Sequence, residues 1–307
     1  MVAKTRRTPE SSAASREGTL RWSVERRLAF IEERLFWLGE VNRADLIGAF
    51  GVSASQASQD IARYLELEPD GLAYDKSAKR YVAGADFRPV LAAPDAARFL
   101  GELRLAGLGI LPADATLLGG GAPFDTAPIP ERRIDPYVLR AVLAAIRARQ
   151  GLVVTYQSMR REKPGRRLIA PKALAFDGFR WHARAFDFES REFRDFVLGR
   201  MTRPAADLRS ERRLADAPAR DADWESFVDL VIAPHPGLTR AQARAISLDY
   251  GIQRGSARIR VRRALLFYAL KRLGLDVPPE TRPPNEQHIV LLNREEIERL
   301  KPAAQQI

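Results

Sequence analysis

Helix-capping residues limit what the segment from residue 23 to residue 71 can fold into. Ser23 has the short polar side chain typical of a helix N-cap, and Gly39 is the kind of residue that commonly ends a helix. Between them, apolar residues recur at three- and four-residue steps, which predicts one amphipathic helix. These residues are Leu28, Ile31, Leu35 and Leu38.

The same signals repeat twice further along the chain. Asn42 is a second N-cap, and the helix that it begins, Arg43–Phe50, ends at Gly51. Ser53 is a third N-cap, for a helix that runs to about Leu67. This segment is therefore predicted to form three helices separated by tight turns.

A β-hairpin is predicted directly after the third helix. Pro69-Asp70-Gly71 has the composition of a turn, and short strands are predicted at Leu72–Tyr74 and Arg80–Val82. Three helices followed by a hairpin are the layout of a winged helix-turn-helix DNA-binding domain. We expect this domain to span residues 22–90.

The third helix of this domain carries small polar side chains near its N-terminus. Serine hydroxyls bind phosphates or base edges, and a glutamine side chain binds adenine through two hydrogen bonds in the major groove. Cations further along the helix and in the hairpin are suited to phosphates. The predicted DNA-binding residues are Ser53, Ser55, Gln56, Ser58, Gln59, Arg63, Lys76, Lys79 and Arg80. A polar helix face that meets only water is the alternative interpretation.

The charge of residues 22–90 does not by itself favour DNA, because 9 Lys and Arg stand against 11 Asp and Glu. DNA binding would then depend on where the few cations lie and on dimerisation, since two half-sites double the number of phosphate contacts. We therefore expect a homodimer that binds a double-stranded operator with an inverted repeat.

The composition favours a cytoplasmic protein that binds polyanions. The chain has 307 residues, enough for two or three domains, and a formal net charge of +11. It has no cysteine and three histidines without metal-ligand spacing, so neither a metal site nor a cofactor is expected. No Walker loop or catalytic triad pattern indicates an enzyme. No apolar run approaches the roughly 20 residues of a membrane span, and no signal peptide is recognisable.

Two segments outside the predicted domains are expected to be irregular. Residues 1–21 are polar and rich in Ser, Thr and Arg, which is typical of a disordered arm. An arm that touches DNA phosphates is the alternative. Residues 91–133 are rich in Gly, Pro and Ala and are expected to be a linker with one helix at Pro94–Leu105.

Residues 134–213 carry most of the positive charge, with 18 Lys and Arg against 9 Asp and Glu. After a predicted helix at Pro136–Arg149 the hydrophobic period changes to two residues, which indicates β-strands. A small, strongly bent sheet or barrel is expected. The predicted strands are Leu152–Ser158, Leu168–Phe176, Phe179–Phe186 and Phe193–Met201.

Strand alternation gathers cationic and aromatic side chains on one face of this sheet. Arg180, His182 and Arg184 share that face, whereas Trp181 points to the other one and is expected in the core. Arginines and aromatic rings together bind nucleotides through phosphate contacts and stacking. The predicted nucleotide or oligonucleotide pocket contains Tyr156, Ser158, Arg180, His182, Arg184, Arg194, Phe196 and Arg200. In the alternative, the arginines lie on a solvated sheet and pair with Asp187, Glu189 and Asp195.

Residues 214–307 alternate short strands and helices, which suggests a small α+β sandwich. The predicted strands are Phe227–Ile232, Ala257–Val261 and His288–Leu292. The predicted helices are Thr239–Tyr250 and Ala264–Leu273.

Three segments of the basic region resemble the WYL domain of bacterial transcriptional regulators, namely Arg167–Pro171, Gly178–Ala185 and Phe193–Met201. The Trp-Tyr-Leu for which that domain is named is Trp181-His182-Ala183 here. Together with Arg262–Tyr268, the Trp-His form resembles the branch of the family encoded beside phage-defence systems such as BREX and CBASS.

The resemblance implies an α+β multidomain protein with a winged helix-turn-helix, a central Sm/SH3-like β-barrel and a C-terminal extension. It implies a homodimeric repressor of phage-defence genes, relieved by a nucleotide or nucleic-acid ligand in the WYL domain. It adds Arg167 to the pocket. It places dimerisation in the C-terminal extension and in the segment before the WYL domain. A transcriptional activator of the same architecture, or a single-stranded nucleic-acid-binding protein that uses the basic barrel, are the alternatives.

Overall fold

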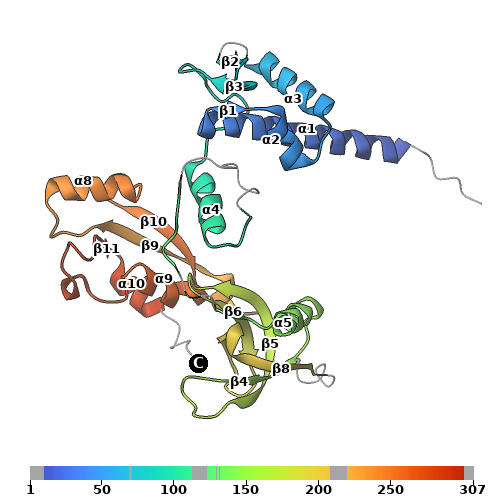
Figure 1. Ribbon diagram of the computed structural model, residues 1–307. Helices are drawn as coiled ribbons and strands as arrows, with labels where there is room; N and C mark the ends of the chain where they lie inside the picture. Colours follow the sequence, from blue (N-terminus) through green and yellow to red (C-terminus); the bar gives the residue numbers. More distant parts are fainter. Residues whose placement is uncertain are drawn as a thin grey trace, which may run out of the picture. The chain divides into compact units, whose positions relative to one another are not determined.

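The structure is a computed structural model that describes residues 10–68, 71–112, 123–128, 130, 132–207 and 220–300. The chain divides into two compact units, residues 1–130 and 131–307, and each is described by itself (Figure 1). None of the described helices is both long enough and apolar enough to cross a membrane.

The first unit is built around the helix caps that the sequence predicts. Asn42 Oδ1 accepts a hydrogen bond from the Asp45 backbone N–H (3.2 Å), and Ser53 Oγ accepts one from the backbone N–H three residues on (3.1 Å). Gly39 and Gly51 have φ angles of 75° and 63°, in the left-handed region that glycine favours. The elements are α1 Glu10–Leu38, β1 Glu40–Val41, α2 Arg43–Phe50, α3 Ala54–Leu67, β2 Leu72–Asp75, β3 Arg80–Ala83 and α4 Ala96–Gly107.

The start of α1 differs from the prediction. The helix begins at Glu10, so the predicted N-cap at Ser23 is wrong and residues 10–21 are helical rather than part of a disordered arm. Residues 1–9 lie outside the described residues. The helix extends because this stretch contains Ala, Arg and Glu, which lose little conformational freedom in a helix, and holds no proline.

The wing is the predicted hairpin of β2 and β3, and a third strand joins it. Within this antiparallel sheet the order is β1-β3-β2, with Glu40 opposite Val82 and Val41 opposite Tyr81. β1 has two residues, too few to show an alternating pattern, which is why the sequence does not predict it. Of the predicted turn before the wing, Pro69 and Asp70 lie outside the described residues.

The carboxylate of Glu32 ties three parts of this unit together. Glu32 lies on α1 and is 3% exposed. It accepts hydrogen bonds from the Tyr64 hydroxyl of α3 (2.9 Å) and from the backbone N–H groups of Val90 (2.6 Å), Leu91 (2.9 Å) and Ala92 (2.9 Å). Burial, together with the bond to Glu32, raises the pKa of Tyr64 above its usual range, so the phenol keeps the proton that it donates.

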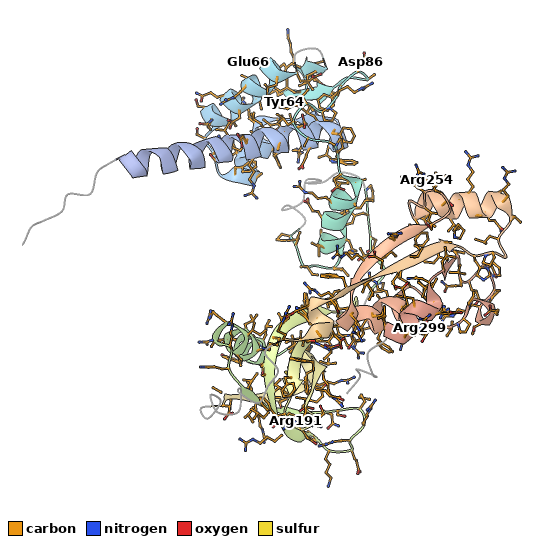
Figure 2. The ribbon with its side chains drawn as sticks, turned by 180° about the vertical axis from the view of Figure 1, so that it is seen from behind. Tyr64, Glu66, Asp86, Arg191, Arg254 and Arg299 are labelled. Atoms are coloured by element: carbon orange, nitrogen blue, oxygen red, sulfur yellow. The ribbon has the colours of Figure 1, made fainter. Side chains whose placement is uncertain are left out.

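Replacement of Glu32 is expected to destabilise the first unit. Glu32→Ala leaves the Tyr64 hydroxyl and three backbone N–H groups without their acceptor, which costs about 3 kcal/mol of unfolding free energy. Urea denaturation of the full chain measures the change. Glu66→Ala is the control, because Glu66 is exposed on α3, close to Tyr64 along the helix (Figure 2). A Glu32→Ala chain as stable as the Glu66→Ala chain would contradict the role of the carboxylate.

The second unit begins with a helix and an antiparallel sheet in the order β7-β6-β5-β4-β8. Its core contains buried side chains from α5, from the strands and from the 3-10 turn after β7, including Val142, Val154, Phe196 and Leu198. The elements are α5 Pro136–Ala148, β4 Leu152–Tyr156, β5 Gly165–Phe176, β6 Trp181–Asp187, β7 Glu192–Val197, a 3-10 turn Leu198–Arg200 and β8 Met201–Ala206.

The predicted closed barrel is not found in the described part of the chain, since β7 and β8 are unpaired edges of an open sheet. The predicted strand Phe193–Met201 is instead two strands separated by the 3-10 turn. Gly199 permits this turn, because a Cβ there would lie 2.8 Å from the carbonyl oxygen of Arg133. The close approach of a distant backbone explains why strand periodicity does not reveal the break.

The rest of the second unit is a three-stranded antiparallel sheet, β10-β9-β11, whose one face packs on α9 and α10 (Figure 1). The predicted strands and the two predicted helices are confirmed, whereas α7 and α10 were not predicted. The elements are α7 Ala222–Glu225, β9 Phe227–Pro234, α8 Arg240–Asp249, β10 Ala257–Arg262, a 3-10 turn Arg263–Leu265, α9 Leu266–Arg272, a 3-10 turn Pro279–Thr281, β11 Ile289–Leu291 and α10 Arg294–Leu300.

Candidate DNA-binding surface and ligand groove

One face of α3 presents polar side chains to solvent, at four-residue steps. The side chains of Ser55, Gln59 and Arg63 are exposed and form no hydrogen bond or ion pair with any residue that the structure describes. These side chains are available to a ligand. α3 is held by a buried ion pair, in which Arg27 Nε on α1 donates to Asp60 Oδ2 at 2.6 Å.

The other three predicted residues of α3 are used within the helix. Ser53 caps it, and the Ser58 hydroxyl donates to the Ala54 carbonyl oxygen at 3.0 Å. Gln56 Nε2 donates to Asp60 Oδ1 at 3.1 Å. These bonds keep part of the polar surface occupied, so the exposed Gln59 is better placed to reach a base.

The wing supplies cations next to α3. Lys76 and Lys79 are exposed, whereas Arg80 forms an ion pair with Glu40 of β1. A cleft of about 260 Å³ lies between the wing and the helices, and polar side chains dominate its lining. Its residues are Asn42, Arg43, Ser58, Ile61, Tyr74, Lys79 and Tyr81. Arg43, Tyr74 and Tyr81 are not recognisable in the sequence as surface candidates, because the pattern places Arg43 on a helix and the tyrosines on strands but does not show which way they face.

Gln59→Ala is expected to weaken operator binding about tenfold, because a two-bond contact with a base is worth about 1–3 kcal/mol. Gln56→Ala is the matched control and is expected to have a smaller effect, since its amide is bound to Asp60. Fluorescence anisotropy at one fixed salt concentration measures both, and sedimentation checks that each variant stays a dimer. Equal losses for the two variants would contradict the assignment of Gln59.

Two of the predicted ligand residues belong to the core. Tyr156 and Phe196 are 2% and 0% exposed, and their rings meet edge to face at 5.1 Å. The Tyr156 hydroxyl accepts a hydrogen bond from the Val197 backbone N–H at 3.2 Å. Ser158 is also buried, and its Oγ accepts from the Arg160 backbone N–H at 3.0 Å, which stabilises the turn after β4. These residues support the sheet and do not line a surface.

Three predicted arginines are neutralised by carboxylates, as in the alternative interpretation. Arg167 pairs with Asp187 at 3.5 Å and with Glu189, and Arg194 pairs with Glu192 at 3.0 Å. Arg184 is fully buried with carboxylates on two sides. Unlike in that alternative, Arg167 and Arg184 are buried and do not lie on a solvated sheet. Trp181 was expected in the core, but it is 45% exposed and packs against Phe176.

Arg184 links the five-stranded sheet β7-β6-β5-β4-β8, which we call the basic sheet, to α7. Its Nε and Nη2 donate to the Asp221 carboxylate at 2.6 and 3.1 Å, and its Nη1 donates to Asp195 Oδ1 at 3.3 Å. Burial alone would lower the pKa of Arg184, but the bonds to Asp221 and the charge of Asp195 raise it above its usual value. The guanidinium is therefore permanently charged and is satisfied by the protein.

Arg184→Met is expected to lower the stability of the second unit by about 3–5 kcal/mol, because buried carboxylates would lose their counter-charge. Arg194→Met is the control, since its partner Glu192 is exposed and such pairs contribute about 1 kcal/mol or less. Hydrogen exchange should show the loss of protection in β6 and β7. Equal protection in the two variants would contradict the role given to Arg184.

The remaining predicted residues, Arg180, His182 and Arg200, come together in a pocket of about 270 Å³. A second pocket of about 370 Å³ shares Arg180 and Tyr268 with the first, so the two form one surface that we call the basic groove. Its other lining residues are Arg132, Met159, Arg160, Asp177, Phe179, Asp195, Val197, Lys271 and Arg272. In the described ranges, no group of three or more His, Asp or Glu side chains is arranged to hold a metal ion.

Asp177 organises the floor of the basic groove. Its carboxylate accepts hydrogen bonds from the backbone N–H groups of Phe179 (2.7 Å) and Arg180 (2.8 Å) and from His182 Nε2 (2.9 Å). Burial alone would raise the pKa of Asp177, but the bonds from His182 and the two backbone groups lower it below its usual value.

His182 and Tyr268 lie side by side in the groove, with ring centroids 5.1 Å apart. His182 is 2% exposed, and its Nδ1 has no hydrogen-bond partner among the described residues. In the tautomer that donates to Asp177 from Nε2, Nδ1 is a buried acceptor. The Tyr268 hydroxyl donates to Asp195 Oδ2 at 3.2 Å, and burial raises the pKa of this tyrosine.

The groove residues that come from distant segments are not predicted from the sequence. Arg160, Tyr268, Lys271 and Arg272 lie outside the strands on which the pocket was predicted. For Tyr268 a signal was present, because it ends the segment Arg262–Tyr268 that carries part of the family resemblance. No local pattern marks the others.

Helices α1–α3 with their wing make the first unit a winged helix-turn-helix domain, the class of fold that reads DNA with its third helix. The comparison with protein families gives the same domain and two more. Residues 23–105 match the BrxR transcriptional regulator winged helix-turn-helix domain, residues 137–206 the WYL domain, and residues 227–297 the BrxR transcriptional regulator C-terminal dimerization domain. The winged-helix match includes α4, which the sequence had assigned to a linker.

Curated relatives match nearly the whole chain, and all three described here are named DNA-binding transcriptional repressor CapW. The one from Stenotrophomonas maltophilia is 38% identical over 288 residues, which is 94% of each chain. The one from Pseudomonas aeruginosa is 37% identical and covers 95% of this chain and 96% of its own. The one from Escherichia coli is 35% identical, over 94% and 95%. The chain belongs to the CapW family of DNA-binding transcriptional repressors.

Proposed function

We propose that this protein is a homodimeric transcriptional repressor that binds a double-stranded operator through α3 and the wing. The observation that carries the proposal is the exposed, unoccupied set Ser55, Gln59 and Arg63 on α3 of a winged helix-turn-helix domain. Lys76 and Lys79 of the wing add phosphate contacts. The family membership favours repression over activation.

In this proposal, dimerisation compensates for a winged helix in which acidic residues outnumber basic ones, 11 to 9. Two copies present two α3 helices to an inverted repeat, and the second half-site binds at high effective concentration. The match of residues 227–297 to a dimerization domain supports this arrangement. The target genes in this proposal are phage-defence genes, and the protein acts in the cytoplasm.

A ligand in the basic groove relieves repression in this proposal. Arg132, Arg160, Arg180, Arg200, Lys271 and Arg272 outnumber the two carboxylates of the groove, which suits an anionic ligand. The exposed ring of Phe179 offers a stacking surface beside the cations. These features suit a nucleotide or oligonucleotide, with phosphates on arginines and a base on the ring.

Footprinting on the DNA upstream of the protein's own gene tests the DNA-binding part. Protection of an inverted repeat, resistant to excess unrelated duplex, is the expected result. A preference for single strands without dependence on sequence would refute it and would favour a single-strand-binding protein.

Arg200→Ala is expected to leave operator affinity unchanged and to reduce the response to the inducing ligand at least tenfold. The reason is that Arg200 lines the basic groove and is remote in sequence from the winged helix. A reporter under operator control, challenged with the inducing stimulus, measures the response. Arg166→Ala, an exposed arginine of β5 that does not line the groove, is the control. Normal induction in the Arg200→Ala strain would contradict a ligand site in the groove.

A further inference from the structure

Strand β10 carries three arginines on one face, at positions 258, 260 and 262, which we call the arginine ladder. The alternate residues Ala257, Ile259 and Val261 pack against the core of the C-terminal sheet. The arginines therefore point to the opposite face. Successive arginines are about 6.7 Å apart, twice the rise per residue of a strand.

Aromatic rings hold two of these guanidinium groups in place. Arg260 lies 4.7 Å from the centroid of the Phe227 ring, and Arg262 lies 4.6 Å from the same ring and 4.7 Å from the Trp224 ring. Arg262 also donates to the Trp224 carbonyl oxygen. Two positive charges beside one ring repel each other, so an anion bound between them would relieve the repulsion.

The ladder lacks carboxylate partners, in contrast to the arginines of the basic sheet. No described Asp or Glu forms an ion pair with Arg258, Arg260 or Arg262. Asp229 lies opposite Arg260 on β9 and is the one acidic residue of β9 and β10. Arg258 and Arg260 are exposed, and Phe227 is 43% exposed.

We propose that the arginine ladder binds the phosphate backbone of duplex DNA, independently of sequence, as a contact separate from the winged helix. Guanidinium groups bind phosphates through paired hydrogen bonds, and the exposed Arg258 and Arg260 follow each other along one face of the strand, as neighbouring phosphates follow each other along DNA. This inference rests on the proposed function for its choice of polyanion. A second copy of the chain fits this face less well, because Asp229 is the one carboxylate that β9 and β10 would offer to the three arginines of each copy in a two-fold interface.

The salt dependence of binding to a duplex without operator sequence tests the proposal in the full-length protein. The variant R258A/R260A removes two phosphate contacts from each protomer, so the slope of log K against log salt is expected to become shallower by about 2 for each ladder that contacts the duplex, and by about 4 if both ladders of a dimer do. Affinity should fall by the same factor for operator and non-operator duplexes. R258K/R260K keeps the charges and should keep the slope.

R240A/R244A is the matched control, because both arginines are exposed on α8 of the same domain. An R258A/R260A slope equal to that of this control would overturn the proposal. So would a shift of R258A/R260A to monomer in sedimentation, because the face would then be a dimer interface. Failure of the wild-type protein to protect an operator would refute the proposed function alone, since the slope on a non-operator duplex is measured separately.

Discussion

A guanidinium that has no access to water is stable only when the protein supplies its counter-charges. Arg184 is in this position, and its two main partners come from different layers, Asp195 from β7 and Asp221 from the residue before α7. Asp195 also accepts a hydrogen bond from the hydroxyl of Tyr268 on α9. Asp195 bonds to both Arg184 and Tyr268, and Arg184 also bonds to Asp221, so these bonds connect the basic sheet to α7 and α9. The basic groove is lined by residues of this sheet and of α9.

The elements that the sequence predicts well are those with local causes. Asn42 and Ser53 cap their helices through bonds within a few residues, so a short window contains all the information. Whether the sheet closes into a barrel, and where the turn at Gly199 interrupts the last predicted strand, depend on contacts between distant segments, which periodicity does not encode. α1 shows the opposite error, since Ser23 could cap a helix but lies inside a longer one that no proline interrupts.

The groove was predicted in part for a related reason. Strand alternation correctly puts His182 and Arg184 on one face, but it does not tell whether that face meets water or a second layer. Here the second layer comes from Asp221 and Tyr268, which lie well beyond the strand in sequence. This layer buries Arg184, whereas Arg180 and Arg200 line the groove. Arginines that the strand pattern predicts to share one surface therefore differ, since one is part of the core and the others are open to a ligand.

The shared acceptor Glu32 has a mechanical consequence. Residues 90–92 connect the wing to α4, and the same carboxylate that holds them also holds Tyr64 on α3. Beyond them α4 packs on α1, through the stacked rings of Trp37 and Phe99 and the ion pair of Arg98 with Glu33. A pull on the chain beyond α4 is therefore resisted first by the contacts of α4 with α1. If residues 90–92 are displaced as well, bonds break at the carboxylate that also holds Tyr64, so movement of this segment is coupled to α3.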